Sequence, residues 1–227
     1  MTDLPHIGLY RRATAAALVA APALFLIDNL IHPTEYERGN EARQLVEIAA
    51  HYERWQLSHA LGFLSVIVFC AAVLGLAFLV RRRQPSVGLW AGALSLTGLL
   101  GLAAVITIDG YTWGVLGDVY QRRGVSPATV EITLDEVQRS DWSLLYYLTP
   151  LAWIVGLAVL ALAAARQGAV PAWAGALLGL GGLMVGIETA VISNAYFIAA
   201  AAVLLAGGAA VAAAIARMSD EAFARGG

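Results

Sequence analysis

The chain has 227 residues, of which 59% are hydrophobic and only 13% are charged, and its formal net charge at pH 7 is −2. A soluble domain carries about a quarter charged residues, so the composition excludes an ordinary soluble protein and favours an integral membrane protein. All fourteen basic residues are arginine, so no lysine is present on which a retinal or pyridoxal Schiff base could form.

The apolar residues fall into six runs, each close to the roughly 20 residues that a helix needs to cross a bilayer. A span must be a helix unless it belongs to a closed barrel, because lipid offers the backbone no hydrogen bonds. Arg11 and Arg12 precede a first run that is longer than the core of a signal peptide, so we expect this run to be a span. The sequence therefore predicts an all-α integral membrane protein, one membrane domain over 1–227, with six transmembrane helices at about 13–32, 57–80, 87–109, 142–165, 171–190 and 195–216.

The placement of arginine predicts the orientation of this six-helix bundle. Arginines precede the first span, follow the sixth, and lie in the short connections between spans two and three and between spans four and five. By the positive-inside rule these segments face the cytoplasm, so both termini are expected there. We expect a multi-pass protein of a cell membrane of the bacterial inner-membrane type.

The connector 33–56 lies on the opposite, extracytoplasmic side and is acidic. Asn40 is a typical helix N-cap, and Leu45, Ile48 and Ala49 share one face of the helix that would follow. We expect an amphipathic helix lying on the bundle or in the membrane interface.

A second extracytoplasmic connector, 110–140, is expected to begin with a loop at Gly110. Ser126 followed by Pro127 is typical of an N-cap and a first helical residue. Three apolar residues then follow at helical spacing, which predicts a second amphipathic helix: Val130, Leu134 and Val137.

Three carboxylates lie within the predicted spans, although acids are costly inside a bilayer. Asp28, Asp109 and Glu188 each lie near the outer end of an odd-numbered span. His32 is one helical turn beyond Asp28, and His59 is in the first turn of the second span, so both reach the same level. Each acid could instead extend to the lipid headgroups and need no partner inside the bundle.

Aromatic and polar residues from the other segments reach this level as well, whereas the inner halves of the spans contribute almost none. This asymmetry predicts a polar cavity in the outer half of the bundle. The candidate substrate-binding residues are His59, His32, Tyr111, Trp113, Tyr146, Asn194, Tyr196 and Trp55.

The leading hypothesis is acid–base catalysis. A carboxylate shielded from water can hold a proton and act as an acid, and aromatic faces stabilise a cation. With Asp28, Asp109 and Glu188 as catalytic acids, the chain loosely resembles membrane-integral terpene cyclases, in which acids on separate spans protonate an olefin or epoxide. The resemblance implies an enzyme of cyclase or isomerase type, with no cofactor, acting on a lipophilic, isoprenoid-like molecule that enters from the lipid bilayer.

Other functions stay open at this stage. A metal, haem or small polar ligand could be held by His32, His59 and Asp109, although no local metal-binding motif is present. Intramembrane acids also mark proton-coupled transporters, which need polar groups continuing toward the cytoplasm. A helper subunit without a site is a third alternative. Nucleic-acid binding is excluded because no basic face exists outside the short arginine runs, and the single cysteine, Cys70, excludes a cysteine-rich metal site.

Overall fold

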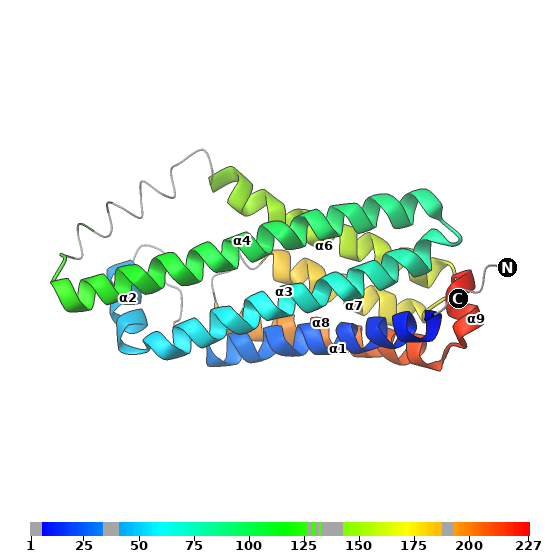
Figure 1. Ribbon diagram of the computed structural model, residues 1–227, viewed down its shortest axis with the longest axis horizontal. Coiled ribbons are helices and arrows are strands. Elements are labelled where there is room, and N and C mark those ends of the chain that lie inside the picture. The colour runs from blue at the N-terminus through cyan, green and yellow to red at the C-terminus, as the bar shows by residue number, and fades with distance from the viewer. Residues whose placement is uncertain (1–5, 34–40, 127–128, 130–131, 133–142, 188–192) are drawn as a thin grey trace.

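The computed structural model describes all residues except 1–5, 34–40, 127–128, 130–131, 133–142 and 188–192. In the described residues every regular element is a helix, and the long helices lie side by side along one axis (Figure 1). The helices are α1 (Ile7–Ile31), α2 (Glu41–Ala50), α3 (Tyr52–Arg81), α4 (Pro85–Arg123), α6 (Ser143–Arg166), α7 (Ala172–Ile187), α8 (Asn194–Arg217) and α9 (Asp220–Arg225).

Six of these helices form a closed ring in chain order. α1 packs on α3, α3 on α4, α4 on α6, α6 on α7 and α7 on α8, and α8 returns to pack on α1. α3 and α6 also meet across the ring, where the rings of Phe69 and Trp153 lie edge to face with centroids 5.3 Å apart. The core of the bundle is therefore filled by side chains from opposite helices.

Glycine allows the neighbouring helices of the ring to approach closely. A Cβ atom at Gly98 would lie 2.0 Å from the backbone nitrogen of Trp153, and one at Gly208 would lie 2.1 Å from the carbonyl oxygen of Leu18. Membrane helices associate through such small residues, because lipid gives no hydrophobic drive for helix association. Each interface of the ring has at least one glycine of this kind: Gly75, Gly110, Gly98, Gly175, Gly181 and Gly208.

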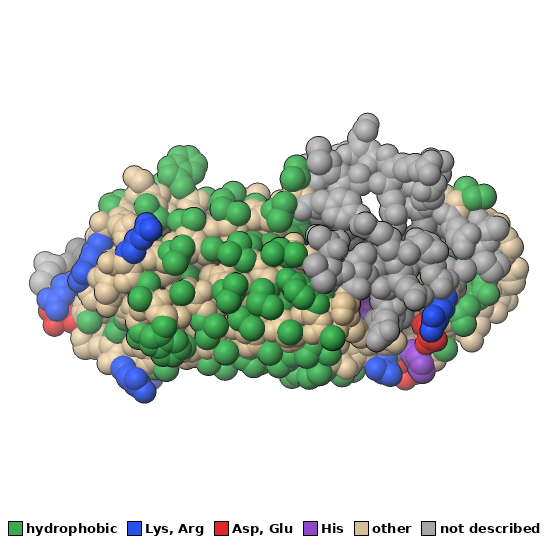
Figure 2. All heavy atoms as spheres, turned by 180° about the vertical axis from the view of Figure 1, so that it is seen from behind, with side chains coloured by type: hydrophobic (Ala, Val, Ile, Leu, Met, Phe, Trp, Pro, Cys, Tyr) green, Lys and Arg blue, Asp and Glu red, His purple; other side chains and the backbone are tan. Residues whose placement is uncertain are grey.

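The outer surface is that of a multi-pass membrane protein. Five helical segments are long and apolar enough to cross a bilayer, namely α1, α3, α4, α8 and Leu148–Arg166 of α6. Large apolar side chains point outward from them, such as Ile67, Leu100 and Val155, which are each about half or more exposed. Figure 2 shows hydrophobic side chains over the middle of the bundle and charged side chains toward its two ends.

The six predicted spans correspond to the six helices of the ring, with shifted ends. Most of the predicted ends move by only one or two residues, as for the predicted 195–216 against α8 at Asn194–Arg217, while α1 and α3 begin earlier than predicted, at Ile7 and Tyr52. α7 has sixteen described residues and is shorter than the other apolar helices, and the end of the predicted span 171–190 lies outside the described residues.

The loop predicted to begin at Gly110 is wrong. α4 continues without a break to Arg123, so its 39 residues extend about 58 Å at 1.5 Å per residue. Gly110 and Gly114 both face α3, since Gly110 lies against His59 and Gly114 lies against Tyr52 and Trp55. The helix ends instead at Gly124, which adopts the left-handed conformation (φ 63°) that favours glycine at a helix C-terminus.

Beyond the ring, α2 and the extended ends of α3 and α4 form a small second core. Leu45 and Ile48 of the predicted amphipathic helix are fully buried, and they pack with Trp55 and Trp113. The N-cap predicted at Asn40 lies outside the described residues. Most of the helix predicted after Ser126 does so too, although the Ser126 hydroxyl accepts a hydrogen bond from the Thr129 N–H at 3.2 Å.

The opposite end of the bundle holds both the start of α1 and the short helix α9 (Figure 1). Arg11 Nε donates to Asp220 Oδ1 at 2.8 Å, and Phe223 is fully buried and stacks on Phe78 of α3. The arginines of the connection between α3 and α4 lie at this same end, with the guanidinium of Arg82 over the Phe78 ring.

Candidate functional site

Two titratable side chains face each other where α3 and α4 leave the ring toward α2. His59 Nε2 of α3 lies 3.4 Å from Asp109 Oδ2 of α4. The His59 side chain is 13% exposed and the Asp109 side chain 33% exposed, so the histidine lies inside the interface and the carboxylate reaches its surface. A titratable pair at the edge of a packed interface can exchange protons with a molecule outside it.

The hydrogen bonds of His59 determine where its protons lie. Its Nδ1 is 2.9 Å from the carbonyl oxygen of Trp55, which can only accept, so Nδ1 carries a hydrogen and donates. The hydroxyl of Ser58 donates to the same carbonyl at 3.0 Å. A carboxylate also only accepts, so the contact between Nε2 and Asp109 needs one further proton, on either partner. A hydrogen bond across this contact would place one proton between the nitrogen and the oxygen.

Trp55 fixes the position of this pair. It is 1% exposed, and its indole N–H donates to the carbonyl oxygen of Gly110 at 2.9 Å, which joins α3 to α4 beside the pair. Its ring centroid lies 4.2 Å from that of His59 and 4.9 Å from that of His32. The two imidazoles are 5.5 Å apart, so the three rings form one cluster. An aromatic face beside an imidazole stabilises the cationic form.

Asp28 approaches His59 from α1. A Cβ atom at Gly62 would lie 2.7 Å from Asp28 Oδ2, so the absence of a side chain at this position of α3 gives the carboxylate its place. Gly62 is three residues after His59, so the two positions share a face of α3 and Asp28 lies on the face that carries His59. The histidine thus lies between carboxylates from two other helices.

The absence of a side chain at Gly110 of α4 likewise leaves room for His59. A Cβ atom there would lie 2.7 Å from both Cβ and Cγ of His59 and 2.8 Å from its Cδ2. The imidazole therefore lies against the backbone of α4, next to Asp109. Sequence analysis missed Gly62, Gly110 and Ser58, although a glycine directly after Asp109 and another three residues after His59 were signals of a close approach to those side chains.

Some of the candidate residues meet in this cluster and others lie elsewhere. Asp28, His32, Trp55, His59 and Asp109 come together, as the expectation of a shared level requires. Tyr111 is 72% exposed and points away from the bundle, because two residues along a helix turn the side chain to the opposite face.

The remaining candidates lie in the second core, which shares Trp55 with this cluster, in another part of the bundle, or beyond the described part of the chain. Trp113 belongs to the small second core around α2. Tyr196 donates its hydroxyl to the carbonyl oxygen of Met184 at 2.9 Å and so joins α8 to α7, and Asn194 begins α8. Glu188 and the side chain of Tyr146 lie outside the described residues.

The ligand set proposed for a metal ion has no counterpart in the described part of the chain. Within it, no three or more His, Cys, Asp and Glu side chains converge in a way that could hold an ion. The two imidazoles and Asp109 are near one another, but Nδ1 and Nε2 of His59 are engaged with Trp55 and Asp109.

No protein-family model, no curated protein and no solved structure matches this chain.

Proposed function

We propose that this chain is a membrane enzyme that transfers protons to and from a lipophilic molecule at the His59–Asp109 pair. The observation that carries the proposal is the hydrogen-bonding pattern of His59, whose Nδ1 is committed to a carbonyl while Nε2 shares a proton with Asp109. A general acid and a general base are then present together at one edge of the bundle.

The position of the pair along α4 supports a substrate from the bilayer. Asp109 lies about 36 Å along the helix from Pro85, counted at 1.5 Å per residue. The hydrocarbon layer is about 30 Å thick. With the arginine-rich end cytoplasmic and six spans, the pair lies at the outer boundary of the membrane, and α2 lies on the extracytoplasmic side. A lipid with a reactive group near its head would reach Asp109 there.

The reaction that fits the pair is an isomerisation that moves the double bond of an alkene. The imidazolium of His59 donates its Nε2 proton to one alkene carbon, and the π electrons form the new C–H bond. A neighbouring C–H bond breaks, its electron pair forms the new double bond, and the Asp109 carboxylate accepts the proton. Proton and electron counts balance, so no cofactor is needed. Trp55 and His32 lie beside the imidazole of His59, and together with Asp28 they stabilise the imidazolium.

Proton-coupled transport is less well supported. A proton path needs polar side chains that continue through the inner half of the bundle. Thr14 is buried in that half and donates its hydroxyl to the backbone carbonyl of Tyr10, and Ser65, nearer the middle of α3, donates to Ala21, both at 2.8 Å. Ser95 of α4 is a further buried hydroxyl in the inner half, and none of these three side chains carries a charge.

Deuterium incorporation tests the proposal without knowledge of the substrate. The purified protein is incubated in D₂O with the cell's own membrane lipids in nanodiscs, and mass spectrometry measures deuterium at carbon positions that do not exchange spontaneously. We expect Asp109→Asn and His59→Gln to lower the rate by about 100-fold or more, the usual contribution of general acid–base catalysis. Size-exclusion elution and tryptophan fluorescence show whether each variant folds.

Asp118→Asn is the matched control, because Asp118 is on the same helix, is 34% exposed and pairs with Arg122 at 2.7 Å, away from His59. It should deuterate lipids at the rate of the unmodified protein. The proposal fails if no lipid gains deuterium above protein-free nanodiscs, or if Asp109→Asn and Asp118→Asn behave alike.

A further inference from the structure

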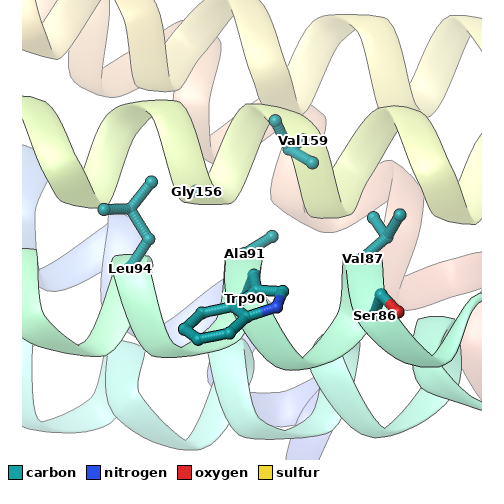
Figure 3. A pocket seen from close by; sticks show the side chains of 7 residues that line it. All are labelled: Ser86, Val87, Trp90, Ala91, Leu94, Gly156 and Val159. Carbon is teal, nitrogen blue, oxygen red and sulfur yellow. The ribbon is translucent and has the colours of Figure 1, made fainter.

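A groove lies between α4 and α6 (Figure 3). Its lining residues on α4 are close to Pro85, at the arginine-rich end of the helix, and so are far along α4 from Asp109. Its volume is about 360 Å³. Trp90 and Leu94 of α4 line one side and Val159 of α6 the other, and of all the lining side chains only that of Ser86 is polar. The groove is therefore shaped by apolar side chains.

The floor of this groove follows from a glycine. A Cβ atom at Gly156 would lie 2.6 Å from the carbonyl oxygen of Ala91, so the two helices touch there through their backbones. The larger side chains on either side of this contact project from the helices and are exposed. Trp90 is 72% exposed, and Leu94 and Val159 are each 40% exposed. In a membrane such a surface is covered by lipid chains.

A positive charge lies at one end of the groove. Arg166 follows Val159 by seven residues, so it lies on the same side of α6 about 10 Å farther along the axis. Arg83 lies at the same corner, where its guanidinium donates to the carbonyl oxygen of Gln167 at 2.9 Å. Arg83 also donates to the terminal oxygen of Gly227, whereas Arg166 is exposed and, among the described residues, is paired with no Asp or Glu side chain.

We infer that this groove binds an anionic phospholipid, with one acyl chain between Trp90 and Val159 and the phosphate on Arg166. The apolar groove suits an acyl chain, since each buried methylene is favourable. The unpaired guanidinium suits a headgroup with net negative charge, because a zwitterionic lipid carries its own cation beside the phosphate. Basic pockets between spans on the cytoplasmic side bind anionic headgroups in this way. The inference is independent of the proposed enzymatic function.

Native mass spectrometry of the full chain tests the site, with phosphatidylglycerol and phosphatidylcholine as probes. We expect one phosphatidylglycerol to be retained more strongly than phosphatidylcholine. Arg166→Gln should weaken phosphatidylglycerol by about fivefold, the effect of one cation near an anionic headgroup, and leave phosphatidylcholine unchanged. Trp90→Ala should weaken both lipids, because it removes a wall of the groove.

Matched controls lie at the same end of the bundle but outside the groove. Trp173 of α7 is 64% exposed and Arg217 ends α8, also exposed. Trp173→Ala and Arg217→Gln should retain lipid as the unmodified protein does. All four side chains are exposed, so the variants should fold, and tryptophan fluorescence together with size-exclusion elution checks this. Equal retention of the two lipids, or equal losses in Arg166→Gln and Arg217→Gln, overturns the inference.

Discussion

Replacing Gly110 by alanine gives the most direct test of how the site is packed. The new Cβ would lie 2.7 to 2.8 Å from three carbon atoms of His59. Carbon atoms in contact prefer about 3.5–4.0 Å, so the two groups must separate by roughly 1 Å. One of the three atoms is His59 Cβ, which is fixed to the backbone of α3. A rotation of the imidazole therefore cannot remove the clash, and α3 must move away from α4.

The energetic effect has two opposing parts. Overpacking of a close contact costs about 1–3 kcal/mol, while alanine is favoured over glycine within a helix by up to about 1 kcal/mol. We expect a net loss of about 1 kcal/mol for Gly110→Ala. The movement should also break the 3.4 Å contact between His59 and Asp109, since it is already long for a hydrogen bond.

Gly114→Ala, one turn along α4, is the matched control. Its Cβ would lie 3.3 Å from Tyr52 Cε2, an atom at the far end of a side chain that can move. This variant should be as stable as the unmodified protein or slightly more stable. Thermal unfolding in detergent, followed by tryptophan fluorescence, measures both, with about 2–4 °C expected per kcal/mol for a chain of this size. If Gly110→Ala melts at or above Gly114→Ala, the packing described for His59 is wrong.

Two further substitutions test the bundle itself. Phe223→Ala removes a fully buried ring that stacks on Phe78 with centroids 5.6 Å apart. A truncation of this kind costs about 3–5 kcal/mol, so α9 should detach and trypsin should cleave after Arg217 several times faster. Gly98→Ala places a Cβ 2.0 Å from the backbone nitrogen of Trp153, which has no freedom to move, so the yield of folded protein should fall sharply.

Each of these two substitutions has a control, in which the same residue type is replaced by alanine at a position that is not tightly packed. Phe63 is 40% exposed, so Phe63→Ala should leave the cleavage rate unchanged. A Cβ at Gly182 would meet only a side-chain methyl group of Leu157 at 3.4 Å, so Gly182→Ala should fold normally. Comparable damage from Gly182→Ala would show that helix approach at Gly98 is not the determining factor.

The sequence predicted the six apolar helices of the ring and the level of the cluster because both follow from local patterns. A bilayer demands long apolar runs, and arginines between them mark the connections. Once spans alternate in direction, Asp28, His59 and Asp109 must lie at the same end. Whether their side chains converge depends on which helices are neighbours. The sequence did not show this, and the order of the helices in the ring does.

The end of the third span could not be predicted in the same way. Glycine weakens an isolated helix by about 1 kcal/mol relative to alanine, so Gly110 after Asp109 suggested a loop, and Gly114 follows it one turn later. In the folded chain both glycines contact side chains of α3, and the packing gained there outweighs the propensity lost. The prediction that Tyr111 lines the pocket depended on the same loop. In the continuous helix, Tyr111 lies two residues after Asp109, and its side chain therefore points away from the bundle.

The closed order of the ring has a consequence for how the chain can be connected. α8 packs on α1 as each helix packs on the next, and Arg11 and Asp220 are within hydrogen-bond distance at 2.8 Å. The fold therefore has no preferred first helix. A short linker between α9 and α1, with a cut between Arg81 and Pro85, would keep every interhelical contact of the ring. The packing of the ring therefore does not determine which helix comes first in the chain. We expect that order to affect synthesis and membrane insertion instead.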